Sequence, residues 1–140
     1  MPNGPTRADP GMSERRALQI AVAIASLVPI FAGGAGVLLG LAMIPVDGAP
    51  IAADSHFRYL SGLLLGIGLA FVSTIPRIET HTARFRGLTA IVVVGGLGRL
   101  LSLALRGYPG KAMLFGLVME LAVTPALMLW QGRVARRCSA

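Results

Sequence analysis

The chain has 140 residues, of which 54% are hydrophobic and only 14% are charged, and its mean hydropathy is +0.71. A soluble domain usually carries about 25% charged residues, so this composition excludes an ordinary water-soluble protein and predicts that lipid surrounds most of the chain. The net charge of +7 does not indicate nucleic-acid binding, because the basic residues fall between apolar runs and no basic patch is interleaved with aromatic residues.

The N-terminal residues 1–14 are polar and rich in proline and glycine, which is typical of a disordered tail. Arg15 and Arg16 follow, and residues 17–44 then carry no charged side chain. As a helix this run would be roughly 42 Å long, against a hydrocarbon core of about 30 Å. We therefore expect it to tilt, or to bend at Pro29. A cleaved signal peptide is disfavoured, because its apolar region covers only about 7–15 residues.

Three further apolar runs of membrane-spanning length follow, at residues 59–75, 87–105 and 112–131. The runs show no two-residue alternation, and a helix satisfies its own backbone polar groups in lipid. The sequence therefore predicts an all-α fold, a four-helix transmembrane bundle in one membrane domain of residues 15–133. Residues 45–55 and 76–86 are expected to be polar loops, and residues 134–140 a basic tail.

The basic residues predict the orientation, since cytoplasmic loops of membrane proteins carry an excess of lysine and arginine. The two tails and the loop between the second and third runs hold Arg7, Arg15, Arg16, Arg77, Arg84, Arg86, Arg133, Arg136 and Arg137. The other side holds only Arg58, Arg106 and Lys111. We therefore expect a multi-pass membrane protein with both termini in the cytoplasm.

Glycines recur at helical spacing inside the runs. The small-xxx-small pairs are Gly36 with Gly40 and Gly62 with Gly66. Such spacing lets helix backbones approach closely in lipid, where the hydrophobic effect between helices is weak. The glycines would serve to pack the four helices together, or would leave one face free for another membrane protein, a second copy of the chain or a flat cofactor.

Two ionisable residues interrupt the last two runs. Arg99 lies roughly 9 Å from the outer end of its run and Glu120 roughly 12 Å from the outer end of the next, at 1.5 Å per residue. Ionisable groups at such depth are costly and usually have partners. The two runs are joined by a tight loop, so the sequence predicts an ion pair between Arg99 and Glu120.

A second polar group precedes the run 59–75. It consists of Asp54, His56 and Arg58, with Tyr59 directly after them. If this segment folds over the bundle, its side chains approach the Arg99–Glu120 pair and form a polar pocket in the outer half of the membrane. These residues are the ligand-binding candidates of the sequence.

Three interpretations of this cluster remain open at the level of sequence. The cluster could hold a structural ion pair that fixes helix register, or bind an anionic or amphipathic small molecule. It could also be an acid–base site that uses Glu120 or Asp54 with His56. No metal site or cofactor is expected, because His56 and His81 fall on opposite sides of the membrane and the single cysteine, Cys138, lies in the tail.

Four segments together resemble a bacterial family of membrane proteins of unknown function, the domain-of-unknown-function family 4345. The segments are DSHFRYLSGLLLGIGLAF from Asp54, IPRIE from Ile75, VVVGGLGRLLSL from Val92 and MELAVTPALMLWQ from Met119. The resemblance covers about residues 18–133 and implies a four-helix inner-membrane protein with no established activity. The recurring polar positions of the family match His56, Arg58, Arg99 and Glu120.

The sequence thus predicts a membrane protein without revealing its biochemical role. The role we expect is that of a non-enzymatic accessory subunit or a binder of a small amphiphile. The alternative is a membrane enzyme acting on a lipid-like substrate by acid–base chemistry of Glu120 and His56. A transporter ranks below both, because four helices leave little room for alternating access.

Overall fold

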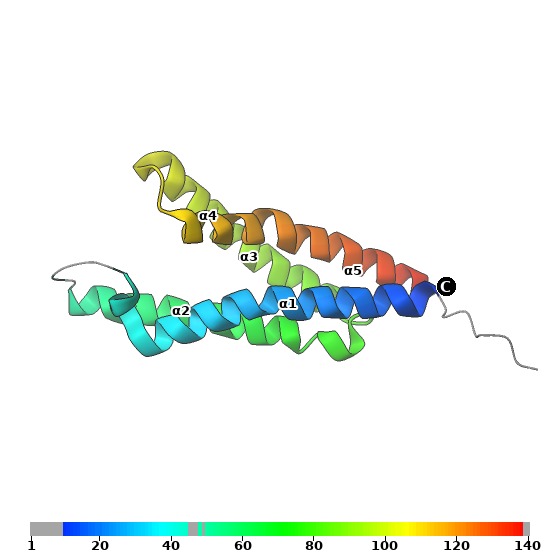
Figure 1. The fold of residues 1–140 in the computed structure, drawn as a ribbon. Helices are drawn as coiled ribbons and strands as arrows, with labels where there is room; N and C mark the ends of the chain where they lie inside the picture. The colour runs from blue at the N-terminus through cyan, green and yellow to red at the C-terminus, as the bar shows by residue number, and fades with distance from the viewer. Residues whose placement is uncertain (1–9, 45–47, 49, 139–140) are drawn as a thin grey trace, which may run out of the picture. The chain divides into compact units, whose positions relative to one another are not determined.

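A computed structural model describes residues 10–44, 48 and 50–138, and every regular element in these ranges is helical (Figure 1). Four helical stretches are long and apolar enough to cross a membrane: Gly11–Met43, Ile51–Arg77, Thr82–Arg106 and Lys111–Cys138. The prediction of an all-α protein with four candidate spans is therefore confirmed.

Large apolar side chains lie on the outside of these helices. Phe31 is 70% exposed, Leu38 77%, Val94 69% and Leu105 73%. In water such a surface would be unfavourable by about 25 cal/mol for each Å² of apolar area. Lipid chains remove that penalty, so the exposed side chains agree with a membrane-embedded protein.

The first helix, α1, runs from Pro10 to Leu39, so residues 10–14, which the sequence analysis assigned to a disordered tail, are helical. Proline is tolerated at a helix start, where its missing N–H is not needed. The α-helix also continues through Pro29. It ends instead at Gly40, whose φ of +60° only glycine adopts readily, and a short 3-10 turn, η1 (Gly40–Met43), follows.

The second helix, α2, runs from Ile51 to Val72 and begins eight residues before the predicted span. The expectation that residues 45–55 form a loop is therefore wrong for residues 51–55, while residues 45–47 and 49 lie outside the described part. Pro50 is extended and forms the N-cap, and Asp54 in the first turn suits the positive end of the helix dipole. A short 3-10 turn, η2 (Ile75–Arg77), follows.

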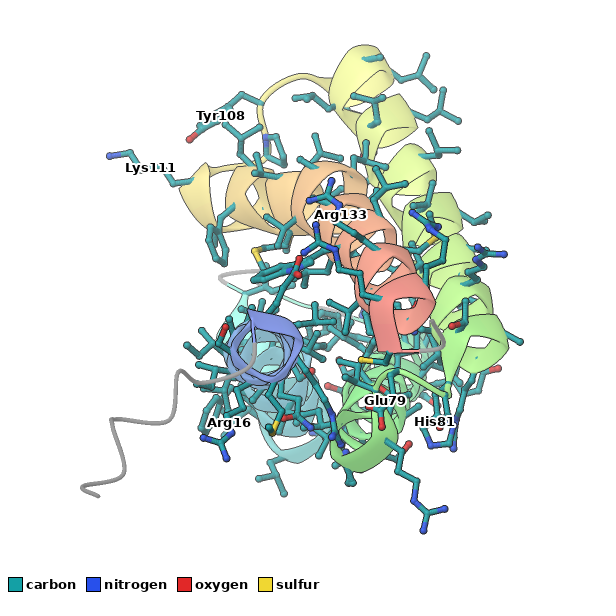
Figure 2. The ribbon with its side chains drawn as sticks, turned by 90° about the vertical axis from the view of Figure 1, so that its right-hand side faces the viewer. Arg16, Glu79, His81, Tyr108, Lys111 and Arg133 are labelled. Carbon is teal, nitrogen blue, oxygen red and sulfur yellow. The ribbon has the colours of Figure 1, made fainter. Side chains whose placement is uncertain are left out.

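The third helix, α3, runs from Thr82 to Arg106, and the fourth span begins with α4 at Lys111–Val118. The turn between them contains Gly107 and Gly110, with φ of +89° and +100°. These are conformations that L side chains rarely adopt. Figure 2 shows Tyr108 and Lys111 at this turn, away from Glu79 and His81 at the other end of α3.

The fourth span is not a uniform α-helix. Its middle is a π-helical segment, η3 (Met119–Val123), and it continues as α5 from Thr124 to Cys138, through residues that the sequence analysis assigned to a tail. Pro125 accounts for the π geometry, because in an α-helix its ring would clash with the carbonyl of Leu121. The wider turn lets the Thr124 N–H bond to Met119 O, and the Thr124 hydroxyl donates to the same oxygen at 2.8 Å.

The chain divides into two compact units. Unit 1 comprises Met1–Ala21 and Pro76–Ala140, and unit 2 comprises Val22–Ile75. In unit 1, α3 packs against α5, η3 and α4, as Figure 1 also shows. The closure of all four helices into one bundle and the orientation of the termini stay predictions.

Glycines mediate the contact between α1 and α2 in unit 2. A Cβ on Gly33 would lie 2.5 Å from the backbone nitrogen of Leu65, and one on Gly36 would overlap Ser61. On the other side of the contact, a Cβ on Gly68 would lie 2.8 Å from Ile30. At Gly33 the nearest atoms belong to the backbone of α2, whereas at Gly36 and Gly68 they belong to the side chains of Ser61 and Ile30. Glycine at these positions lets the two helices approach closely, as expected for helices packing in lipid.

Candidate functional site

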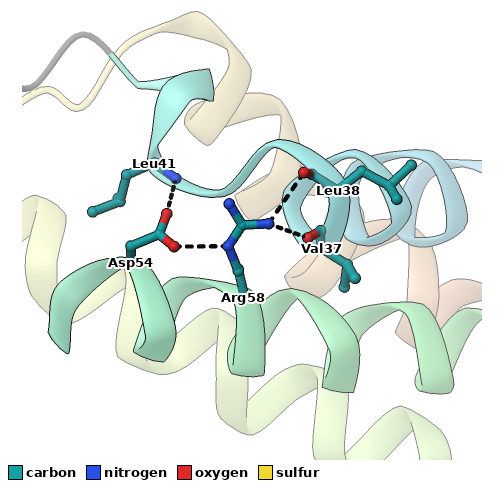
Figure 3. A network of polar contacts seen from close by, with 5 residues as sticks. All are labelled: Val37, Leu38, Leu41, Asp54 and Arg58. Carbon is teal, nitrogen blue, oxygen red and sulfur yellow. Dashed lines mark hydrogen bonds and ion pairs between the residues drawn. The ribbon is translucent and has the colours of Figure 1, made fainter. Parts of the chain in front are cut away.

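In unit 2, Asp54 and Arg58 form a clamp on the end of α1 (Figure 3). Arg58 Nε donates to Asp54 Oδ2 at 2.7 Å, and Arg58 Nη1 donates to the carbonyls of Val37 at 2.6 Å and Leu38 at 3.1 Å. The backbone N–H of Leu41 donates to Asp54 Oδ1 at 2.8 Å. We call these five residues the α1 clamp. It satisfies carbonyls that have no partner within α1, because a helix leaves its last four carbonyls unpaired.

Gly40 makes the clamp possible. Its positive φ ends the α-helix, and a Cβ at this position would collide with Asp54 Oδ1 and would lie 2.5 Å from Arg58 Nη2. The described side-chain hydrogen bonds of Asp54 and Arg58 thus all lie at the junction of α1 and α2. This use of Asp54 and Arg58 is structural.

The remaining two candidates of the predicted outer cluster lie elsewhere on α2. His56 and Tyr59 are exposed, with ring centroids 6.3 Å apart. His56 follows Asp54 by two positions, which is a rotation of about 200° around a helix. The expectation that these residues form one segment ahead of the second helix is therefore wrong. The helix begins earlier and separates His56 from Asp54, which argues against an acid–base pair of the two.

In unit 1, the structure forms the ion pair between Arg99 and Glu120 that the sequence predicts. Arg99 Nε donates to Glu120 Oε2 and Arg99 Nη2 to Glu120 Oε1, both at 3.0 Å. This is the bidentate geometry in which arginine binds a carboxylate most strongly. Arg99 Nη1 contacts the Met113 sulfur at 2.9 Å. The side chains of Arg99 and Glu120 are 31% and 17% exposed, so the pair is accessible.

Glycines surround the Arg99–Glu120 pair. A Cβ on Gly96, one turn before Arg99, would lie 2.9 Å from the Glu120 Cβ and 2.7 Å from Leu121 Cδ2. A Cβ on Gly116, one turn before Glu120, would lie 3.6 Å from the Arg99 Cζ. The absence of a side chain at Gly96 lets the two helices approach closely enough for two parallel hydrogen bonds, whereas a Cβ at Gly116 would make only an ordinary van der Waals contact.

The π-helical segment carries Glu120. Segments of this kind inside α-helices occur frequently at functional sites. Here Pro125 is the local cause, and it shifts the register of η3 relative to the α-helix that follows. In the sequence, the signal for the π-helical segment was Pro125, five residues after Glu120, and the sequence analysis did not use it.

The candidate residues thus fall into two groups. Asp54, His56, Arg58 and Tyr59 belong to unit 2, and Arg99 and Glu120 belong to unit 1. A joint pocket of the two groups stays a prediction. Among the residues that the structure describes, no three His, Cys, Asp or Glu side chains form a group that could hold a metal ion.

A polar cluster that the sequence analysis missed lies at the opposite end of α3. Gln131 is fully buried, and its Nε2 donates to Ile78 O at 2.8 Å and to Thr82 Oγ1 at 2.9 Å. Arg15 pairs with Glu79 at 2.9 Å and donates to Pro76 O at 3.0 Å. These contacts fix the loop of residues 76–81, which includes Glu79 as labelled in Figure 2.

A further ion pair joins the start of α1 to the end of α5 in unit 1. Glu14 near the start of α1 pairs with Arg137 near the end of α5. Both residues lie in parts that the sequence analysis assigned to tails. The ion pair explains in part why the helices continue there, because it joins two terminal turns that would otherwise fray.

The comparisons with known proteins agree with the resemblance read from the sequence. The family model of a domain of unknown function (DUF4345) matches residues 17–131. No curated protein and no solved structure matches the chain. The matched range contains the Asp54–Arg58 and Arg99–Glu120 pairs and most of the four candidate spans. The chain therefore belongs to the DUF4345 family of proteins with a domain of unknown function.

Proposed function

We propose that this protein is a non-enzymatic binder of a small amphiphile in the bacterial inner membrane, and that it binds the amphiphile at the Arg99–Glu120 pair. The observation that carries the proposal is an accessible, bidentate ion pair between two candidate membrane spans, well inside both of them. An intramembrane ionisable residue is by default a candidate functional residue, because its cost must be offset by some use.

The partners of Arg99 support this proposal. Arg99 bonds to the side chains of Glu120 and Met113, so helix formation in unit 1 does not depend on it. Arg58, in contrast, bonds to backbone carbonyls of α1. The pair at Arg99 can therefore exchange a partner for a ligand without unravelling a helix end.

The role of an accessory subunit of another membrane protein stays open beside this proposal, and one observation favours it. Within the described residues, nothing lies within 4 Å of a Cβ built on Gly66, Gly95 or Gly98. Such glycines would suit contact with another membrane protein or with a second copy of the chain. Crosslinking through single cysteines at Gly66 and Gly95 in membranes would test this. The absence of dimer or heteromer bands at both positions would contradict it.

An acid–base enzyme that uses Glu120 and His56 is less well supported. Both carboxylate oxygens of Glu120 accept hydrogen bonds from Arg99, so this pairing would have to open before Glu120 took a proton from a substrate. His56 belongs to the other unit and stands on the face of α2 away from Asp54.

The orientation with both termini in the cytoplasm rests on the distribution of arginine and lysine. A reporter that is active only in the cytoplasm should be active when fused after Cys138 and inactive when inserted at Tyr108. The reverse pattern would overturn this orientation.

The binding proposal is tested by what copurifies with the protein. Full-length protein is extracted in a mild detergent, and small molecules are identified by mass spectrometry. The matched control is the double variant Arg99→Met with Glu120→Leu, which replaces the pair by apolar side chains of similar size. We expect at least one amphiphile enriched with the wild type and lost from the folded double variant. Identical profiles for the two proteins would overturn the proposal.

A further inference from the structure

We infer that the amphiphile has a neutral head, with an acceptor oxygen that bonds to Arg99 and a hydroxyl group that donates to Glu120. This inference rests on the proposed function and deepens it, because it names the ligand class. It contradicts the simpler expectation that an intramembrane arginine selects an anionic head.

The first step is the charge of the site. Arg99 and Glu120 are joined by two parallel hydrogen bonds, so their charges cancel within the pair. An added anion would find no net positive charge there, and it would lose its hydration in a medium of low dielectric constant. A neutral head loses far less hydration free energy on entering the same site.

The second step is the supply of hydrogen bonds. A guanidinium group carries five N–H donors, and within the described residues three hydrogen bonds from Arg99 are present. An ionised carboxylate has about four acceptor positions, and Arg99 occupies two of those on Glu120. The pair therefore retains donors on one partner and acceptors on the other, which a carbonyl next to a hydroxyl would satisfy together.

The third step is room beside the pair. Side chains of a helix lean toward its N-terminus, so Arg99 extends over the turn that contains Gly95 and Gly96. A Cβ on Gly95 would meet no atom of the described chain within 4 Å, while Gly116 faces the Arg99 guanidinium from the other helix. A head group can therefore approach Arg99 without displacing a side chain of that turn.

The fourth step is the competition at the end of the span. Arg106 and Lys111 flank the α3–α4 turn and are exposed. An anionic head would be held there, in contact with water, whereas Arg99 lies roughly 10 Å deeper along α3 at 1.5 Å per residue. A neutral head gains nothing from these two cations and is free to reach the deeper site.

The test compares two probes with the same acyl chain, 1-oleoylglycerol and oleoyl lysophosphatidate. Binding of each to the full-length protein in neutral detergent micelles is measured by native mass spectrometry. We expect the wild type to bind the neutral probe about tenfold more tightly than the double variant Arg99→Met with Glu120→Leu does, which corresponds to roughly 1.4 kcal/mol. The phosphate probe should bind both proteins equally, because Arg106 and Lys111 are present in both. Tighter binding of the phosphate probe to the wild type than to the double variant Arg99→Met with Glu120→Leu would overturn the inference and leave the proposed function standing.

Variants of the pair sharpen the test. Glu120→Gln leaves Arg99 as an unpaired cation, so it should reverse the preference toward the phosphate probe. If this variant does not fold, the exchange Arg99→Glu with Glu120→Arg keeps the pair neutral and should keep the preference for the neutral probe. Equal binding of both probes to the wild type and to the double variant would overturn the inference and the proposed function together.

Discussion

Two arginine–carboxylate pairs, one in each unit, differ in what the arginine binds. In the α1 clamp, Arg58 bonds to Asp54 and to the carbonyls of Val37 and Leu38, which end a helix. In unit 1, Arg99 bonds to Glu120 and to the Met113 sulfur, and to no backbone carbonyl that is described. The chemistry of the side chains is the same, but the first pair completes a helix end and the second connects two helices.

This difference separates a pair that stabilises the end of a helix from a pair that is available to bind a ligand. Removing Arg58 would leave backbone carbonyls without donors, and no change of the carboxylate could replace them. Removing Arg99 would leave one carboxylate, which a second substitution can neutralise. A polar pair in lipid is therefore a better candidate for ligand binding when its partners are side chains alone.

The largest effect is expected at the Arg99–Glu120 pair. Arg99→Met leaves Glu120 unpaired and should destabilise the protein by about 3 kcal/mol, the order of the cost of an unpaired charged side chain within a membrane span. Glu120→Gln should also destabilise, and the double variant should recover part of the loss, since removing both charges can be nearly neutral. Unfolding in mixed micelles containing sodium dodecyl sulfate, followed by circular dichroism, measures the four proteins. If the loss of stability in the double variant equals the sum of the two single losses, the two side chains are not coupled. That result would contradict the difference drawn between the two pairs.

A smaller effect is expected at the glycine contacts. Gly33→Ala places a Cβ 2.5 Å from the backbone of Leu65, which cannot move alone. Overpacking of this kind costs about 1–3 kcal/mol. Gly96→Ala should cost less, because the nearest atom, at 2.7 Å, is the end of the flexible Leu121 side chain, and the only contact below 3.0 Å that is fixed to the backbone is the Glu120 Cβ at 2.9 Å.

Each glycine has a matched neighbour as a control. A Cβ on Gly34 or Gly95 meets nothing within 4 Å in the described chain, so alanine there should be neutral or slightly stabilising, by up to about 1 kcal/mol from helix propensity. The same unfolding assay ranks the four variants. A larger loss for Gly96→Ala than for Gly33→Ala would contradict the view that the contact in unit 2 is the more rigid one.

The smallest effect is expected at the α1 clamp, because Arg58 and Asp54 are more exposed than the other pair, at 41% and 36%. Arg58→Met should lower stability by less than Gly33→Ala. The decisive result is the double variant with Asp54→Asn, which should show no recovery, because the carbonyls of Val37 and Leu38 still lack a donor. Recovery similar to that at Arg99 would show that the two pairs are equivalent.

Much of the candidate site was predictable from particular residues. Arg99 and Glu120 are opposite charges at similar depth on two runs joined by a tight loop. Their pairing could be predicted because an unpaired charge is costly in lipid. The Asp54–Arg58 pair was also within reach, because the spacing of four residues is that of neighbours on a helix. It was missed because the start of α2 was placed eight residues too late, after Pro50 was taken as part of a loop.

Other features could not be derived from a local pattern. The buried Gln131 bonds to Ile78 and Thr82, which are about fifty residues away in the chain. The π-helical segment at Glu120 depends on how Pro125 is accommodated, and a proline can also kink or end a helix. In both cases several local solutions are compatible with the sequence, and packing selects one.

The sequence by itself determined that this chain is all-helical, that it has four candidate spans and that an ion pair joins the last two. The reason is that lipid demands long apolar helices and does not tolerate unpaired charge. Only the tertiary structure decided that Arg58 ends α1 while Arg99 faces another side chain. A pattern of residue types does not show which backbone carbonyl or which glycine contacts another helix. These contacts are decided only when two helices pack together.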